Sequence, residues 1–157
     1  MDLLARDDRS LMREALRLAT KAAEVGEVPV GALVAKDGRV IGRGYNQVEM
    51  LKDATAHAEI LALTQASAKL GDWRLNDCEL FVTKEPCPMC AGAAVQARVR
   101  RVVFGCADPR GGAAGSMINL LQMPSLNHRC DISSGLLGDE CASLLQTFFR
   151  DRRAEGL

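Results

Sequence analysis

The sequence has no net charge, no long apolar segment and no signal-like start. Lys and Arg together number 20, as do Asp and Glu, so composition does not indicate a basic nucleic-acid-binding protein. Any RNA partner therefore needs a locally basic face. No run approaches the ~20 apolar residues of a membrane span, so we expect no membrane association. The first eight residues lack the basic-then-apolar order of a signal peptide, so we expect a cytoplasmic protein.

The sequence also lacks internal repeats, low-complexity segments and linkers. A length of 157 residues and a hydrophobic fraction of 48% suit one globular domain, which we expect to span residues 1–157. Two of the six cysteines form a Cys-x-x-Cys pair of the metal-binding kind, which favours a reducing compartment over a disulfide framework. Free thiols are expected at the other four, Cys78, Cys106, Cys130 and Cys141.

Helices and strands alternate along the chain, as expected of an α/β protein. Apolar periodicity and turn residues predict helices over residues 10–25, 58–70, 88–97 and 138–152, with a short helical piece over 118–123. Strands are predicted over residues 30–35, 39–45, 78–83, 101–105 and 130–133. We expect loops over residues 47–56 and 106–117. This order predicts a three-layer α/β/α sandwich around a mixed five-stranded sheet.

Two short motifs carry the candidate chemistry. His57 stands two residues before Glu59, and two residues separate Cys87 from Cys90. One imidazole and two thiols suit Zn²⁺, and a set of three leaves the fourth tetrahedral position open for water, as in catalytic sites. Zinc lowers the pKa of bound water towards about 7. Glu59 can move protons there without ligating the metal.

Both motifs are predicted at the starts of helices. The first turn of the 58–70 helix carries His57 and Glu59, where backbone N–H groups and the helix dipole favour anionic ligands. The 88–97 helix begins beside Cys87 and Cys90, where the pKa of a thiol falls. We therefore expect the metal centre beyond the C-terminal ends of neighbouring strands, the usual ligand position in an α/β sheet.

Other interpretations stay open on these residues alone. The Cys-x-x-Cys pair could be a redox pair. It could also belong to a closed four-ligand zinc site, with Cys78, Cys106 or His128 as the fourth ligand. His57 could be a buried core histidine. Asn46, which follows the second strand, is most simply a turn asparagine. The conjunction of histidine, spaced glutamate and Pro-Cys-x-x-Cys favours the catalytic site.

The sequence resembles the bacterial tRNA-specific adenosine deaminases of the TadA type, within the cytidine deaminase-like superfamily. The resemblance covers about residues 10–153. It is carried by residues 26–32, 46, 54–59, 82–93, 102–105, 112–116, 127–129 and 148–150. The His-Ala-Glu and Pro-Cys-x-x-Cys motifs identify only the superfamily. A Gly-Ala-Ala-Gly-Ser loop, an Asn-His-Arg triplet and a Phe-Phe-Arg end point to tRNA.

The resemblance implies zinc-dependent hydrolytic deamination of adenosine to inosine at the wobble position (34) of a tRNA anticodon. One zinc ion per subunit would be bound by His57, Cys87 and Cys90, and Glu59 would be the catalytic proton shuttle. The resemblance also implies that Asn46 contacts the flipped purine, against the turn interpretation.

The same resemblance implies further substrate contacts and an assembly. The pocket would be bordered by Val30, Ala58 and Pro86. The anticodon stem-loop would be contacted by Asp108, Asn127, Phe149 and Arg152. Proteins of this family are homodimers in which the RNA contacts both subunits, so we expect a homodimer here.

Two positions depart from the family pattern, and two alternative functions stay open. Bacterial relatives usually carry an apolar residue at the position of Lys84, and Pro88 is common in the guanine-deaminase branch. The first rival is a small-molecule deaminase acting on guanine, cytosine or cytidine, against which the Arg-rich end and the Asn-His-Arg triplet argue. The second is a non-catalytic zinc-stabilised RNA-binding or scaffold protein, against which Glu59 argues.

Overall fold

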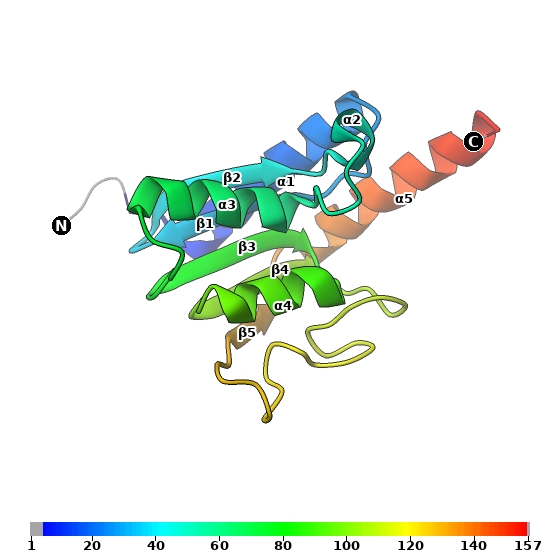
Figure 1. Ribbon diagram of the computed structural model, residues 1–157. Helices are drawn as coiled ribbons and strands as arrows, with labels where there is room; N and C mark the ends of the chain where they lie inside the picture. The colour runs from blue at the N-terminus through cyan, green and yellow to red at the C-terminus, as the bar shows by residue number, and fades with distance from the viewer. Residues whose placement is uncertain (1–4, 157) are drawn as a thin grey trace.

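A mixed sheet of five strands forms the middle layer of the molecule, as a computed structural model shows for residues 5–156 (Figure 1). The strands lie in the order β2-β1-β3-β4-β5. β1 is antiparallel to β2 and β3, whereas β3 and β4, and β4 and β5, are parallel. Their bounds are β1 Gly31–Lys36, β2 Arg39–Tyr45, β3 Cys78–Lys84, β4 Arg101–Cys106 and β5 Asp131–Ser134.

Helices cover both faces of this sheet. α1 and α5 lie on one face, and α3 and α4 lie on the other (Figure 1). The bounds are α1 Asp8–Glu24, α2 Val48–Leu51, α3 Ala58–Leu70, α4 Pro88–Gln96 and α5 Gly138–Ala154. The predicted three-layer α/β/α sandwich and its mixed five-stranded sheet are therefore confirmed.

The central strands are apolar on both faces because both faces are covered. In β1, Val34 packs into the cluster under α3 and α4, whereas Leu33 belongs to the cluster under α1. In β3, Leu80 and Phe81 divide between the two clusters in the same way. Successive side chains of a strand point to opposite faces, so continuous apolar runs are what a doubly covered sheet requires.

The first turn of α3 rests directly on β2. A Cβ atom at Gly44 would come within 3.0 Å of the Ala58 carbonyl oxygen, and one at Gly42 would come as close to the Ala62 carbonyl oxygen. Glycine at these two positions lets the backbones approach so closely. This contact fixes where the helix that follows His57 begins.

Most predicted boundaries agree with the structure, and three differ, two of them for local reasons. α1 begins at Asp8, two residues early, because the Asp7 carboxylate accepts a hydrogen bond of 2.8 Å from the N–H of Ser10 and caps it. α2 was not predicted within the 47–56 loop. The helical piece predicted over residues 118–123 is wrong. Turns form there instead, because the side-chain oxygen of Asn119 accepts from the N–H of Gln122 at 3.2 Å.

Two sequence-based expectations extend past the described residues. The predicted single domain, 1–157, includes residues 1–4 and 157, which lie outside the part that the structure describes, so it stays a prediction. The expectation that the chain has no signal peptide also rests partly on residues 1–4, which lie outside the described part. Within residues 5–156, the helices are too short or too polar for any of them to span a membrane.

Candidate functional site

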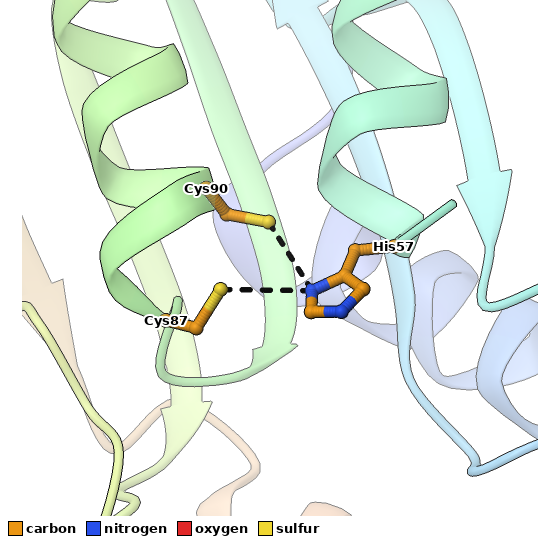
Figure 2. Close-up of side chains that lie close together, drawn as sticks. All are labelled: His57, Cys87 and Cys90. Carbon is orange, nitrogen blue, oxygen red and sulfur yellow. Dashed lines mark hydrogen bonds between the residues drawn. The ribbon is translucent and has the colours of Figure 1, made fainter. Parts of the chain in front are cut away.

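Three metal-binding side chains meet at the starts of two helices. Nδ1 of His57 lies 3.6 Å from Sγ of Cys87 and 3.5 Å from Sγ of Cys90 (Figure 2). His57 is the residue before α3, Cys87 is the residue before α4, and Cys90 lies in the first turn of α4. Both motifs therefore begin helices, as predicted.

The spacing of these three donors fits tetrahedral zinc. With Zn–N near 2.0–2.1 Å and Zn–S near 2.3 Å, tetrahedral angles place nitrogen and sulfur ligands about 3.5 Å apart. In the described residues, the group of ligand atoms within 4.8 Å of one another consists of His57, Cys87 and Cys90. A closed site with a fourth ligand from Cys78, Cys106 or His128 is therefore not what the described residues form.

The proposed alternative ligands make other contacts. His128 Nε2 lies 2.7 Å from the carbonyl oxygen of Val99. The thiol of Cys78 donates to the carbonyl oxygen of Asn76, and that of Cys106 donates to the carbonyl oxygen of Thr83. No cysteine forms a disulfide within residues 5–156, and Cys78, Cys106, Cys130 and Cys141 are free thiols, as predicted.

One of the three donors, Cys87, is deprotonated without a metal ion. A hydrogen bond with Cys90 lowers the pKa of Cys87 to about 4, and the neighbouring His57 acts in the same direction. The hydrogen bond with Cys87 in turn raises the pKa of His57. The proximity of Cys87, together with burial, raises the pKa of Cys90. Cys87 is thus a thiolate at neutral pH, which is the form that binds metals.

Glu59 is a buried carboxyl group beside the three donors. It lies in the first turn of α3 and is 4% exposed. Burial raises its pKa to about 7, and the negative charge of Cys87 adds to the effect. A carboxyl group with this pKa can both hold and release a proton near neutral pH, as general acid–base catalysis requires.

A cavity of about 830 Å³ opens beside His57, Glu59 and Cys87. Its walls come from the segment before β1, the residue after β2, α2, the start of α3, the end of β3 with the segment after it, the segment after β4 and the last helix. Nine of the twelve residues predicted for the site line this cavity: Val30, Asn46, His57, Ala58, Glu59, Cys87, Asp108, Phe149 and Arg152. Residues from six parts of the chain are thus brought together.

Three predicted residues lie off the cavity wall. Cys90 is fully buried behind Cys87, and Pro86 is buried with its carbonyl oxygen accepting a hydrogen bond of 2.8 Å from the N–H of Ala113. Asn127 is exposed on the irregular segment between β4 and β5 and does not line the cavity.

Asn46 carries an unmet hydrogen-bonding group at the cavity wall. Its side-chain Nδ2 donates to the carbonyl oxygen of Val28 at 3.3 Å, and the residue is 8% exposed. Its Oδ1 atom is buried and has no partner among the described residues. An unpaired buried acceptor is costly, so a ligand that brings a donor to it gains binding energy.

Sequence reasoning gave no role to four charged residues that line the cavity, Glu27, Glu49, Lys84 and Glu85. The carboxylate of Glu27 accepts from the N–H groups of Glu49 and Met50, at 3.1 and 2.7 Å, and so holds α2 in place. No local signal could reveal this, because the partners lie more than twenty residues along the chain.

Comparisons with known proteins find deaminases. The chain matches the MafB19-like deaminase family over residues 6–153. It is 48% identical to the tRNA-specific adenosine deaminase of Bacillus subtilis over 146 residues, which covers 93% of this chain and 91% of that protein. It is 45% identical to the enzyme of the same name from Haemophilus influenzae over 149 residues, or 94% of this chain and 86% of that protein.

Solved structures share the fold. A chain from a study of A-to-I editing by tRNA:A34 deaminases at the wobble position of transfer RNA superimposes with a TM-score of 0.84 and 45% identity, covering 87% of this chain and 99% of that one. The guanine deaminase of Nitrosomonas europaea gives a TM-score of 0.80 at 29% identity, covering 94% of this chain and 86% of that one. The cytidine deaminase-like fold expected from the sequence is therefore confirmed.

Proposed function

This chain belongs to the MafB19-like deaminase family and, within it, to the tRNA-specific adenosine deaminases, and we propose that it hydrolyses the wobble adenosine (position 34) of a tRNA anticodon to inosine. The observation that carries the proposal is the buried Glu59 beside three zinc-type donors, in one cavity. The 48% identity to the Bacillus subtilis enzyme supports tRNA adenosine as the substrate.

We expect one zinc ion per chain, held by His57, Cys87 and Cys90. His57 would bind through Nδ1, the ring nitrogen that lies 3.5–3.6 Å from the two sulfur atoms. Two thiolates balance the charge of the ion. When bound, zinc supplies a water molecule whose pKa is lowered towards about 7.

Glu59 would move the protons of the reaction. It takes one proton from the attacking water as the water oxygen forms a bond with C6 of adenine, and it delivers that proton to N1. It then takes the second proton of the water from the oxygen now bonded to C6 and delivers it to the amino group. The C6–N6 bond breaks, and ammonia leaves. One water is consumed and one ammonia released. The pKa of about 7 allows Glu59 to act first as base and then as acid.

The base would sit between Asn46 and the start of α3. Val30 and Ala58 form apolar wall, and Pro86 lies behind the wall beside Cys87. Asn46 would contact the purine nucleotide, and its unpaired Oδ1 is available to a ligand donor. A stacked base cannot reach this depth, so the nucleotide must be splayed out of the loop, which costs a few kcal/mol and less in single strands.

The anticodon stem-loop would extend from the cavity mouth over the last helix. Asp108, Phe149 and Arg152 line the cavity, and Phe149 is 42% exposed, as a stacking residue must be. Asn127 would contact RNA farther from the reacting base. We propose a homodimer acting on cytoplasmic tRNA, and the exposed Met117 and Ile118 are apolar surface available to a second subunit.

One other function has a specific observation in its favour. The guanine deaminase of Nitrosomonas europaea shares the fold at a TM-score of 0.80, so free guanine is the competing substrate. We would incubate the zinc-loaded protein with an anticodon stem-loop carrying adenosine at the wobble position and, separately, with guanine. Inosine in the stem-loop alone supports the proposal, whereas ammonia from guanine with an untouched stem-loop overturns it.

The salt dependence of the reaction gives an independent check. Each phosphate contact in a single-stranded RNA releases counterions, so kcat/KM for the stem-loop should fall steeply as salt increases. Activity on a neutral base should change little over the same range.

A further inference from the structure

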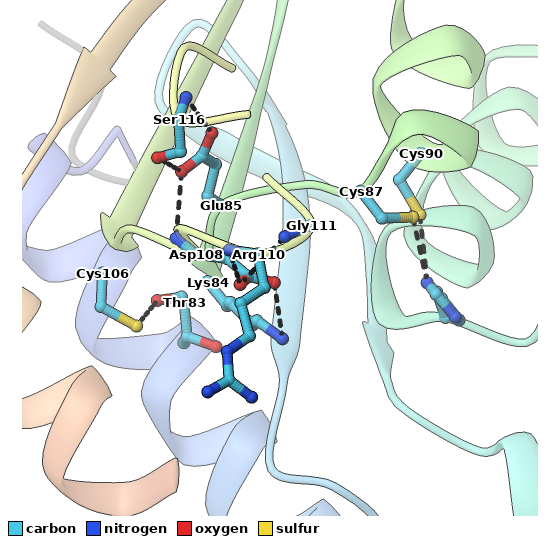
Figure 3. A network of polar contacts seen from close by, with 11 residues as sticks. Thr83, Lys84, Glu85, Cys87, Cys90, Cys106, Asp108, Arg110, Gly111 and Ser116 are labelled. Atoms are coloured by element: carbon cyan, nitrogen blue, oxygen red, sulfur yellow. Dashed lines mark hydrogen bonds and ion pairs between the residues drawn. The ribbon is translucent and has the colours of Figure 1, made fainter. Parts of the chain in front are cut away.

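The carboxylate of Glu85 is surrounded by the glycine loop, the name used here for residues 107–116. Glu85 directly follows β3 and is 3% exposed. Oε1 accepts from the N–H of Asp108 at 3.0 Å and from the hydroxyl of Ser116 (Figure 3). Oε2 accepts from the N–H groups of Ala114 and Ser116, at 2.9 and 3.1 Å. Four donors from one loop therefore converge on one carboxylate.

Two backbone hydrogen bonds also join the segment after β3 to the glycine loop and to the residue before it. The N–H of Glu85 donates to the carbonyl oxygen of Cys106 at 2.8 Å, and the N–H of Ala113 donates to that of Pro86 at 2.8 Å. A Cβ atom at Gly112 would come within 3.0 Å of the Glu85 carboxylate, so the loop passes directly over it. The glycine loop is thus attached to the turn that leads into the metal ligand Cys87.

Asp108 is the member of the glycine loop that lines the cavity. Its Oδ1 accepts from the N–H groups of Arg110 and Gly111, at 3.1 and 3.2 Å. Its Oδ2 forms an ion pair of 3.2 Å with Nζ of Lys84, the residue before Glu85. Lys84 therefore holds the side chain of Asp108 while Glu85 holds its backbone N–H (Figure 3).

We propose that Glu85 is a positioning residue that acts on tRNA binding through Asp108, by fixing the glycine loop at the cavity wall. The inference rests on the proposed function, in which Asp108 contacts the anticodon loop. Although Glu85 borders the cavity, both of its oxygens already accept hydrogen bonds from the loop, so it does not itself receive the substrate. Burial raises its pKa, but the Ser116 hydroxyl and three N–H groups outweigh this and keep the carboxylate ionised.

The first test is Glu85→Gln in the zinc-loaded protein. The amide keeps the size of the side chain, but its NH₂ group would face N–H donors of the loop. We expect KM for the stem-loop to rise about tenfold while kcat falls less than about threefold, because binding and not chemistry depends on the loop. Hydrogen exchange at the N–H groups of Ala114 and Ser116 should become faster, with zinc content as in the wild type.

A double-mutant cycle with Asp108→Ala separates positioning from general stability. If Glu85 acts through Asp108, Glu85→Gln adds little to KM once Asp108 is removed. The matched control is Glu79→Gln, at the opposite end of β3, where Glu79 pairs with Arg101 and Arg100. It removes a partly buried carboxylate from β3 itself and should leave KM unchanged.

Four results would contradict either the role of Glu85 or the proposed function. An unchanged KM in Glu85→Gln, or an equal rise in the Asp108→Ala background, overturns the inference. If Glu85→Gln does not fold, Ser116→Ala removes one donor and should give a smaller, equally non-additive rise. If it gives none, the inference fails. A wild-type protein that leaves the stem-loop unedited would overturn the proposed function instead, and that result is visible before any variant is made.

Discussion

Nδ1 of His57 and Sγ of Cys87 lie 3.6 Å apart, although thirty residues separate them in the sequence. Each belongs to the residue just before a helix, and the two helices lie on the same face of the sheet. The candidate metal site therefore lies at a junction between α3 and α4, and metal binding there can be measured independently of catalysis.

Substitution of a donor should abolish zinc binding. Cys87→Ser replaces a thiolate of low pKa with a hydroxyl group, which is a poor zinc ligand. We expect the zinc content, measured by elemental analysis, to fall from about one ion per chain to nearly none. Cys130→Ser is the control, because Cys130 is a buried free thiol outside the donor set. A Cys87→Ser protein with full zinc would contradict the assignment.

Loss of the carboxylate at Glu59 should remove turnover and keep the metal. Glu59→Gln preserves the size of the side chain but cannot accept or deliver a proton, so kcat should fall roughly 10²–10⁴-fold. Zinc content should equal that of the wild type, since Glu59 is not among the three donors. A Glu59→Gln protein as active as the wild type would exclude the proton-shuttle role.

Asn46→Ala should weaken substrate binding without unfolding the protein. The change removes a 3.3 Å hydrogen bond to Val28, but it also removes an acceptor that is buried and unpaired, so the two effects on stability oppose each other. We expect kcat/KM to fall about tenfold or more, with little change in Tm. An unchanged kcat/KM would return Asn46 to the role of a turn residue.

Gly44→Ala should disturb the metal centre from a distance. Its new Cβ would collide with the Ala58 carbonyl and push the start of α3 away from β2. We expect a loss of about 1–3 kcal/mol in the free energy of unfolding, together with weaker zinc affinity. Gly92→Ala, in the interior of α4, is the control. Its Cβ has room, the nearest atom being Leu120 Cδ2 at 3.6 Å, so it should stabilise by roughly 0.5–1 kcal/mol.

Acid should weaken the attachment of α1 to β2. Burial raises the pKa of Glu14, but hydrogen bonds and charge from Arg43 and Arg6 outweigh this and hold it below its ordinary value of 4.5. The carboxylate thus contributes stability that is complete above pH 4.5 and is lost as pH falls through the lower pKa of the folded state. Glu14→Gln should lower the free energy of unfolding at pH 7 by less than about 1 kcal/mol, because Arg43 is half exposed.

The comparison is made by urea unfolding at pH 7 and at about pH 3. The difference between wild type and Glu14→Gln should shrink at the lower pH, because Glu14 is then protonated in the unfolded chain and its contribution to stability is being lost. A difference that is equal at both values would mean that packing, and not charge, is what Glu14 contributes.

The sequence predicted those features that depend on neighbouring residues. Apolar spacing located the long helices and the strands, and the His-x-Glu and Cys-x-x-Cys spacings located the three donors. Contacts between distant segments were not predictable in this way. Glu27 holds α2 through residues more than twenty positions away, and Glu85 holds the glycine loop across a similar distance. Only the folded sheet brings these carboxylates to their partners.

A local signal also misled at one place. The apolar stretch after Ile118 suggested a helix, but the side chain of Asn119 forms a turn with Gln122 instead. Asn46 follows a strand, where asparagine is commonly a turn residue. Only the structure shows that its Oδ1 is buried and unpaired beside the cavity.

The position of β3 between β1 and β4 also sets the order in which the chain can assemble. The β1–β2 hairpin is local and can form as soon as both strands exist. The pairing of β3 with β1 is not local, because β2, α2 and α3 lie between these two strands in the sequence. His57 precedes β3 in the sequence, and Cys87 follows it. The three donors come together only when β3 lies between β1 and β4, so we expect zinc binding to follow the pairing of the central strand.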